Sequence, residues 1–173
     1  VGNLEPRKNL VTLIDAFAEL VRQQTFAGPL VIVGKAKYRG EEAAGAVARH
    51  GLGGRVIFTG FIDDATLRLL YNRAILFAYP SLYEGFGLTL LEAMACGCPV
   101  VASKATAIPQ TAGDAAILVD PTSVAALTAA MARVIGDPEL ARRMSAEARA
   151  QAARFSWTRT AELTRRVYQE ALS

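Results

Sequence analysis

The stretch that decides the fold is Ser81 to Gly97, which reads SLYEGFGLTLLEAMACG. It follows an apolar run predicted as a strand over 75–79, and its second half has the pattern of a helix over 88–96. Gly85 and Gly87 let the backbone approach a ligand closely, and the first amides of a helix favour a phosphate. On these residues alone, a glycine-rich turn with a surface glutamate is the alternative interpretation.

The rest of the chain alternates strand and helix patterns around this stretch. Continuous apolar runs of strand length are typical of parallel sheets buried on both faces. Segments with apolar residues at helical spacing separate these runs, and this alternation with short connections indicates a doubly wound α/β fold. The predicted strands are 30–33, 56–58, 75–79, 99–102 and 116–119, and the predicted helices are 10–24, 41–50, 63–72, 88–96, 123–135, 138–154 and 158–172.

The first two residues, Val1 and Gly2, resemble the end of a strand and the turn that follows it. A doubly wound domain needs a complete first strand at that place. We therefore expect the sequence to be a piece of a longer protein whose start lies upstream.

Length and composition exclude several classes of protein. The chain has 173 residues, of which 52% are hydrophobic and 20% charged, so it is not disordered. No apolar run approaches the ~20 residues of a membrane span, and no secretory signal opens the sequence. Cys96 and Cys98 do not form a zinc site, and we expect them to be reduced, in a cytoplasmic protein that needs no metal.

The net charge of +3 lies entirely in residues 133–173, which hold eight arginines and five acidic residues. This is too sparse for the basic surface of a nucleic-acid-binding domain, so we expect no nucleic-acid partner. Two interpretations stay open. The charge is either a solvated helical face or a surface that meets another domain or a membrane.

The two glutamates of the stretch Ser81 to Gly97 suit hydroxyl groups of a ligand rather than phosphates. Glu92 lies about 7 Å along the predicted helix from Gly87, and Glu84 lies in the loop before it. Like charges repel, so neither carboxylate suits a phosphate at the helix start. A ribose diol fits Glu92, a sugar hydroxyl fits Glu84, and Thr89 adds a hydroxyl in the first turn.

A basic pair, Arg7 and Lys8, precedes the first predicted helix. Cations at a helix N-terminus oppose the helix dipole, so the pair needs another explanation. Arginine as a fork and lysine as a point charge could clamp a diphosphate. A solvated basic helix start is the alternative.

These stretches resemble retaining glycosyltransferases of family 4 (group 1). Glu84 and Glu92, with seven residues between them, match the E-x7-E motif of that family. Further blocks match in order over about residues 1 to 130: EPRKNL at 5–10, GFIDD at 60–64, YPS at 79–81, GCPVVAS at 97–103 and GDAA at 113–116.

The resemblance implies a Rossmann-like doubly wound parallel sheet with terminal helices. Family members have two such domains in the GT-B arrangement. Residues 1–173 resemble the C-terminal, nucleotide-sugar-binding domain, with a terminal helix at 156–172 and the N-terminal acceptor domain absent. The resemblance further implies that the isolated fragment is inactive.

The resemblance also implies roles for individual residues. Arg7 and Lys8 match the pair that neutralises the donor diphosphate, and Glu84 matches the acid near the transferred sugar. Glu92 matches the acid that accepts from the ribose hydroxyls. Donor contacts are further implied for Phe86, Gly87, Leu88, Thr89, Gly34, Lys35 and Phe61, the last in the 58–62 loop that borders the base.

The sequence departs from the family pattern at three positions. Thr89 stands where many members have proline, and it keeps its amide. Asn3 replaces an arginine that many relatives carry, so Arg7 must supply more of the phosphate binding. Gln110 replaces a frequent glutamate, which puts any acid role at that position in doubt.

The implied reaction is sugar transfer with retained anomeric configuration and without a metal cofactor. The donor would be GDP-mannose or a UDP-sugar, as in a mannosyltransferase of polysaccharide or glycolipid synthesis. The acceptor would be a glycan or a lipid-linked glycan, and the protein would act in the cytoplasm, with peripheral contact at the inner face of the membrane as one option.

Three alternatives remain beside this reading. The chain could bind a nucleotide sugar without transferring it. It could belong to another GT-B enzyme, such as a nucleotide-sugar 2-epimerase or a sucrose-type synthase. A flavodoxin-like receiver domain is disfavoured, because Asp63 and Asp64 precede a helix instead of ending a strand.

Overall fold

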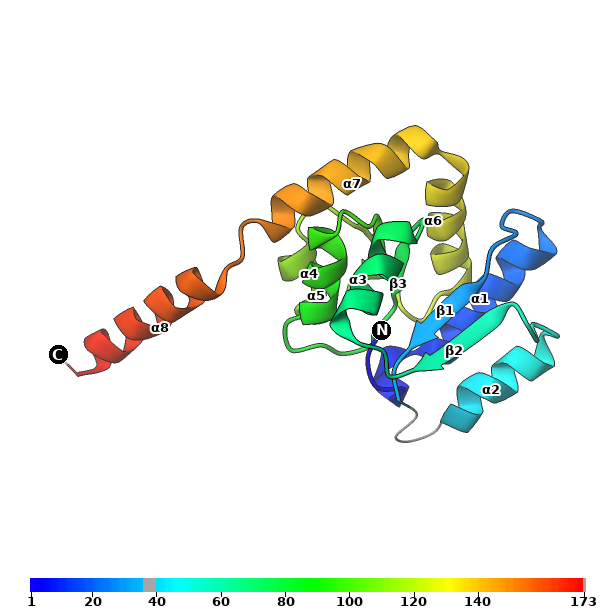
Figure 1. The fold of residues 1–173 in the computed structure, drawn as a ribbon, viewed down its shortest axis with the longest axis horizontal. Coiled ribbons are helices and arrows are strands. Elements are labelled where there is room, and N and C mark those ends of the chain that lie inside the picture. Colours follow the sequence, from blue (N-terminus) through cyan, green and yellow to red (C-terminus); the bar gives the residue numbers. More distant parts are fainter. Residues whose placement is uncertain (36–39, 173) are drawn as a thin grey trace.

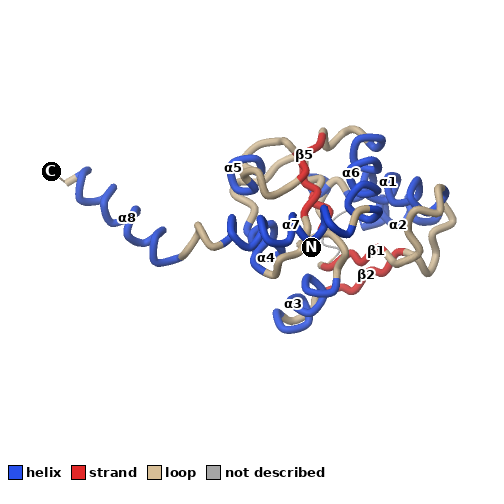
Figure 2. The backbone as a smooth tube through the Cα atoms, turned by 90° about the horizontal axis from the view of Figure 1, so that it is seen from above, coloured by secondary structure: helices blue, strands red, loops and turns tan. Residues whose placement is uncertain are grey.

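The strands form two parallel sheets rather than one continuous sheet. The computed structural model describes residues 1–35 and 40–172. One sheet pairs β1 (Leu30–Val33) with β2 (Val56–Gly60), and the other has the order β3 (Phe77–Tyr79), β4 (Val100–Ser103), β5 (Ile117–Val119). Figure 2 shows the two groups of strands apart from each other. The predicted α/β class with parallel strands is confirmed, while the division into two sheets was not predicted.

Helices surround these strands in the predicted order (Figure 1). The 3-10 helix η1 and the short helix α5 were not predicted. The helical elements are η1 (Pro6–Lys8), α1 (Leu10–Arg22), α2 (Gly40–Arg49), α3 (Asp64–Arg73), α4 (Leu88–Ala95), α5 (Ile108–Ala112), α6 (Val124–Gly136), α7 (Pro138–Ala152) and α8 (Trp157–Ala171).

Side-chain caps fix where several helices begin. Asp63 accepts from the Thr66 amide at the start of α3, and Ser123 accepts from the Ala126 amide at the start of α6. These caps satisfy amides that have no partner inside the helix. Strand β3 is shorter than predicted, because its pairing with β4 begins only at Phe77.

The core lies in three apolar clusters that α1 and the strands connect. Helix α1 packs against α2 and α6, and α4 packs against α7. One cluster centres on β3, α4 and β4, a second on α1, α6 and α7, and a third on α1, β1 and α2. This packing holds the loops that follow the strands in fixed positions.

Helix α8 leaves the body as a separate arm (Figures 1 and 2). None of its residues is buried, and Trp157 at its start is 78% exposed. Within residues 1–35 and 40–172, no helix combines the length and apolar character that crossing a membrane requires.

Candidate functional site

The predicted site residues follow the carboxyl ends of parallel strands. Gly34 and Lys35 follow β1, Phe61 follows β2, and the loop 80–87 follows β3. Ligands of open α/β sheets bind at this edge. The fold therefore places the predicted residues where such a site is expected.

A compact ion-pair network joins the basic pair to the first glutamate. The Lys8 Nζ lies 2.7 Å from Glu84 Oε1, and a guanidinium nitrogen of Arg7 lies 2.8 Å from Glu84 Oε2. Arg7 also pairs with Glu5 at 2.7 Å. Lys8 and Glu84 are each only 9% exposed, so both charges have lost most of their hydration. Each charge offsets this loss for the other.

The network keeps Glu84 ionised. Burial opposes ionisation, but hydrogen bonds from Lys8 and Tyr79 and the charge of Lys8 outweigh it, and the pKa of Glu84 lies below its ordinary value. The Lys8 ammonium also lies 5.0 Å from the centre of the Tyr79 ring. The site therefore contains two cations and two carboxylates, those of Glu5 and Glu84, in a single connected arrangement.

Hydrogen bonds to backbone carbonyls hold this network in position. The Leu82 amide donates to the Arg7 carbonyl at 2.8 Å, which ties the loop after β3 to η1. Asn9, in the left-handed conformation with φ 56°, donates from Nδ2 to the carbonyls of Pro80 and Pro121. These bonds fix Arg7 and Lys8 against the loop that carries Glu84.

Thr106 positions the backbone of Glu84 from the other side. The Glu84 amide donates to Thr106 Oγ1 at 3.0 Å, and the same hydroxyl donates to the Glu84 carbonyl at 3.1 Å. Sequence reasoning missed Thr106, Tyr79 and Asn9. Asn9 lies in the EPRKNL block and Tyr79 in the YPS block, but Thr106 lies in none of the matched blocks.

The N-terminus of α4 lies at the surface beside this network. Gly87 precedes the helix with φ 97°, a conformation that favours glycine. The Thr111 hydroxyl donates to the Phe86 carbonyl at 2.6 Å, and the Phe86 ring packs edge-on against Phe155 at 5.8 Å. Leu88, the first residue of α4, is exposed, and the first amides of a helix have no partner within the helix and favour an anion.

Glu92 lies one turn further along α4 and is exposed. Partial burial and the nearby charge of Asp64 raise the pKa of Glu92.

Lys35 and Phe61 form a second group. The Lys35 ammonium lies 5.3 Å from the centre of the Phe61 ring. Gly34, at φ 139°, approaches the backbone so closely that a Cβ would lie 1.8 Å from the Gly2 carbonyl oxygen. The Lys35 carbonyl accepts from the Leu4 amide at 3.0 Å, which links this pair through the backbone to the segment that precedes η1.

Two of the three positions that depart from the family pattern, Asn3 and Gln110, do not enter the network. Asn3 and Gln110 are both exposed. Asn3 lies between residues that pair with the end of β1, and Gln110 lies on α5. Among residues 1–35 and 40–172, no group of three metal-ligating side chains comes together.

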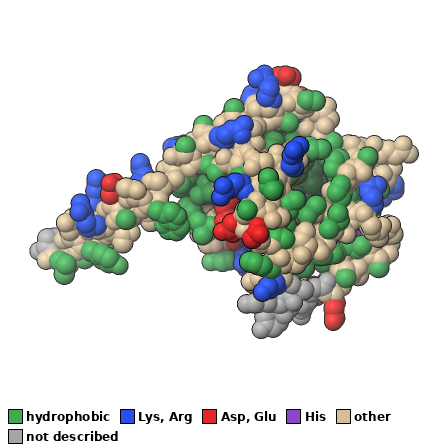
Figure 3. Space-filling view, in the orientation of Figure 1, with side chains coloured by type: hydrophobic (Ala, Val, Ile, Leu, Met, Phe, Trp, Pro, Cys, Tyr) green, Lys and Arg blue, Asp and Glu red, His purple; other side chains and the backbone are tan. Residues whose placement is uncertain are grey.

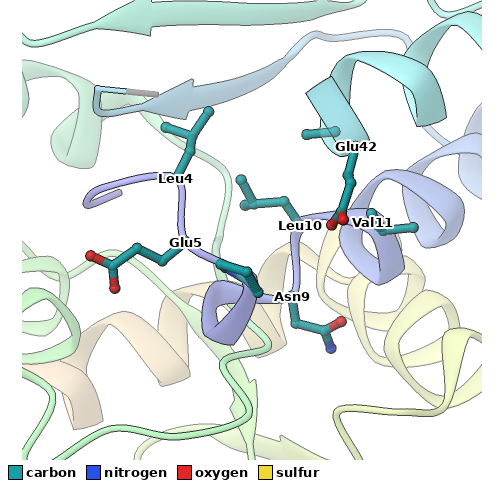
Figure 4. Close-up of a pocket in the computed structure, with 8 residues that line it drawn as sticks. Leu4, Glu5, Asn9, Leu10, Val11 and Glu42 are labelled. Atoms are coloured by element: carbon teal, nitrogen blue, oxygen red, sulfur yellow. The ribbon is translucent and has the colours of Figure 1, made fainter. Parts of the chain in front are cut away.

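A small cavity of about 210 Å³ adjoins the site between η1, α1 and α2 (Figure 4). Leu4, Leu10 and Val11 form an apolar wall, and Glu42 extends from α2 toward it. The Glu5 and Asn9 side chains point away from this wall, in agreement with their bonds to other groups. The charged network therefore does not converge on this cavity.

Comparison with known proteins assigns the family. Residues 1–151 match the model of the family described as glycosyl transferases group 1. The chain is 36% identical over 169 residues to an O-antigen chain mannosyltransferase B of Escherichia coli, covering 98% of this chain and 44% of that protein.

Solved structures agree in fold. Sucrose-phosphate synthase of Thermosynechococcus elongatus superposes with a TM-score of 0.85 at 32% identity, covering 99% of this chain and 45% of that one. The Anabaena HepE protein in complex with UDP and glucose superposes with a TM-score of 0.82 at 28% identity, covering 99% and 47%. The chain thus spans less than half the length of these proteins.

The chain belongs to the group 1 glycosyltransferase family. The resemblance noted in the sequence is confirmed at this level.

Proposed function

We propose that the chain is the donor-binding domain of a retaining glycosyltransferase that uses a nucleotide-diphosphate sugar. The observation that carries this proposal is the Arg7–Lys8–Glu84 network beside the exposed N-terminus of α4. Two fixed cations and a helix N-terminus suit a diphosphate, while the carboxylate suits a sugar hydroxyl.

The proposed chemistry is stabilisation of the leaving group. As the bond to the transferred sugar breaks, negative charge grows on the departing diphosphate. Arg7, Lys8 and the first amides of α4 would offset this charge without reorganising, because the fold already holds them. We expect no metal ion to be needed for that step.

Four site residues have further places in this proposal. Glu84 would hold both cations and face the transferred sugar, and Glu92 would accept from the ribose hydroxyls. The raised pKa of Glu92 fits a group that meets hydroxyls rather than phosphate. Lys35 and Phe61 would border the nucleotide base.

The donor would be GDP-mannose or a UDP-sugar. The Escherichia coli relative is named a mannosyltransferase, which supports the first. The Anabaena structure contains UDP and glucose, which supports the second. The acceptor would be a glycan or lipid-linked glycan held partly by another domain of the same protein.

Calorimetric titration of the chain with GDP, UDP and ADP tests the proposal. We expect one nucleotide to bind, and Glu92→Ala to weaken that binding. Arg142→Ala, an exposed change on α7, is the control with no expected effect. Absence of binding to all three nucleotides, in this chain and in the full-length protein, would exclude a donor domain.

Two other functions remain testable. A pure binding module would bind nucleotide but release no sugar in the full-length protein. The superposition on sucrose-phosphate synthase favours keeping a sucrose-type synthase as the second enzyme candidate. Product analysis by NMR separates these, because it identifies the acceptor, the anomeric configuration and any epimerised donor.

We also propose a cytoplasmic protein with peripheral membrane contact through α8. This helix carries Arg159, Arg165 and Arg166 together with exposed Trp157 and Tyr168. Basic and aromatic side chains on one exposed helix suit an anionic lipid surface. Flotation with anionic vesicles tests this, and loss of binding on removal of α8 is the expected control result.

A further inference from the structure

Two threonine hydroxyls hold the loop that precedes α4. The Thr106 hydroxyl accepts from the Glu84 amide at 3.0 Å and donates to the Glu84 carbonyl at 3.1 Å. The Thr111 hydroxyl donates to the Phe86 carbonyl at 2.6 Å. Both threonines lie between β4 and β5, so one segment of the chain fixes the loop on either side of Gly85.

Helix α7 in turn fixes Thr111. The Gln151 side chain donates to the Thr111 carbonyl at 3.0 Å. This approach requires a glycine at position 113, because a Cβ on Gly113 would lie 2.9 Å from Gln151 Nε2. Thr111 is only 1% exposed, so water does not compete for the hydroxyl that holds the Phe86 carbonyl.

The Phe86 side chain has a fixed partner as well. Hydrophobic side chains gather on the surface where α8 leaves the body (Figure 3). Phe155 lies in this connection, and its ring packs edge-on against the Phe86 ring with 5.8 Å between the ring centres. Because both the ring and the carbonyl of Phe86 are held, the peptide between Phe86 and Gly87 is restricted to one orientation.

These contacts determine where two amides of the loop point. In a trans peptide, the carbonyl and the amide that follows it point in opposite directions. The Glu84 and Phe86 carbonyls point at the threonine hydroxyls, so the amides of the next residues, Gly85 and Gly87, point away from them. Neither amide has a hydrogen-bond partner in the part of the chain that the structure describes. A Cβ on Gly85 would meet no atom within 4 Å, so the space beside it is open.

Thr106 makes its bonds from an unfavourable backbone conformation. Its φ is 53°, in the left-handed region, where a β-branched residue is strained. Such strain persists only where the surrounding structure imposes it, and it is concentrated at functional sites. A glycine would adopt this conformation easily but would have no hydroxyl for Glu84. The threonine at this position is therefore explained by its hydroxyl rather than by the turn.

We infer that Thr106 and Thr111 are positioning residues that aim the Gly85 and Gly87 amides at the donor diphosphate. The inference rests on the proposed function, which supplies this ligand. Neither threonine would touch the donor, because each acts through the backbone of the loop.

The charge beside the loop agrees with an anionic ligand. The Arg7 guanidinium donates to the Tyr83 carbonyl at 3.3 Å, so a cation lies next to the two free amides. Amides that are held in place before binding need no reorganisation, and they bind an anion more tightly than the amides of a loose loop. Loss of either hydroxyl should therefore weaken diphosphate binding even though the fold is retained.

NMR relaxation of the full-length protein without ligand tests whether the hydroxyls hold the loop. Thr111→Val removes the hydroxyl and keeps the side-chain shape, whereas Thr111→Ser keeps the hydroxyl. We expect the order parameter of the Gly87 amide to fall from about 0.85 to below about 0.6 in Thr111→Val alone. The matched control is Thr128→Val, which removes another buried threonine hydroxyl, bonded within α6, and should leave the loop unchanged.

Calorimetric titration of the same proteins tests the connection to the donor. The probes are the nucleoside diphosphate that the unaltered protein binds and the corresponding nucleoside, which has no phosphate. We expect Thr111→Val and Thr106→Val each to weaken diphosphate binding about tenfold and to change nucleoside binding less than twofold. Thr111→Ser and Thr106→Ser should restore diphosphate binding, because they restore the hydroxyl.

Two results would overturn the inference. An order parameter for Gly87 that stays near 0.85 in Thr111→Val would show that the hydroxyl does not hold the loop, whether or not a nucleotide binds. Diphosphate binding that is unchanged in the valine variants, or weakened as much as nucleoside binding, would show that the threonines have no positioning role. Failure of the unaltered protein to bind any nucleoside diphosphate is a separate result, which contradicts the proposed function and with it the donor as the target of these amides.

Discussion

Lys8 and Glu84 show how two charged residues can be buried at the same place. They are 76 positions apart in the sequence, yet their side chains meet at 2.7 Å. Neither charge would be tolerated there alone, since burying an unpaired charge is strongly unfavourable. A group 1 glycosyltransferase domain thus keeps a cation at its proposed diphosphate site by pairing it with a carboxylate that is fixed through Thr106.

Removing the Lys8 ammonium should slow the complete enzyme. Lys8→Ala and the longer Lys8→Met should each lower kcat by about 100-fold or more, because one fixed cation is lost opposite the leaving group. Steady-state kinetics of the full-length protein measures this. Near-normal kcat in a folded Lys8→Met variant would remove Lys8 from the mechanism, and Arg142→Ala should behave like the unaltered protein.

Glu84→Gln should destabilise the chain by about 3 kcal/mol at neutral pH, since Lys8 stays buried with a weaker partner. The folded pKa of Glu84 lies below the ordinary value of 4.5, so its ionic contribution is present above pH 4.5 and is lost as pH falls through the folded pKa. The stability difference should therefore shrink below pH 4.5. Urea unfolding between pH 3 and 7 measures it.

The control for this experiment is Glu139→Gln, which breaks the exposed pair with Arg142. Its effect should stay below about 0.5 kcal/mol at every pH. A difference between Glu84→Gln and the unaltered chain that is constant from pH 3 to 7 would contradict the assigned role of the ionised Glu84.

At the scale of elements, helices α7 and α8 contribute very differently to the fold. Helix α7 buries Leu140, Met144 and Ala148 and packs against α4, whereas α8 buries no residue. The sequence pattern alone predicted both as helices with equal clarity. Periodicity shows that a helix has an apolar face, but it does not show which surface, if any, covers that face.

Ending the chain after Phe155 should therefore leave the body intact. We expect the thermal midpoint to change by less than about 2 °C, because residues 156–172 are all exposed. Phe155 is retained, since its ring contacts Phe86. Ending the chain after Gly136 instead also removes α7 and should prevent cooperative unfolding. A large loss of stability in the chain that ends at Phe155 would contradict this assignment.

At the scale of the whole molecule, the sequence predicted the order and type of nearly every element. Strand 30–33 agrees with β1, and the predicted helices 63–72 and 123–135 correspond to α3 and α6, which Asp63 and Ser123 cap. Hydrophobic period and turn residues determine these features locally. The short helix α5 was missed, because its five residues contain a proline and are too few to show a helical period.

The candidate site was predictable in its location but not in its connections. Motif residues after strand ends pointed to Arg7, Lys8 and Glu84, and the fold brings these together. Sequence spacing could not show that Glu84 pairs with both cations, since that contact depends on how η1 docks on the loop after β3. The split of the sheet was likewise invisible, because strand pairing is not encoded within a single strand.

Helix α8 is connected to the rest of the domain only through residues 153–156. Its 15 residues are about 22 Å long, so a rotation of about 20° at this connection moves the far end by about 8 Å. No buried contact on α8 resists such a rotation. The direction of the helix is consequently set by whatever it touches beyond this body, and a spectroscopic label near Tyr168 would report that contact as a change in angle.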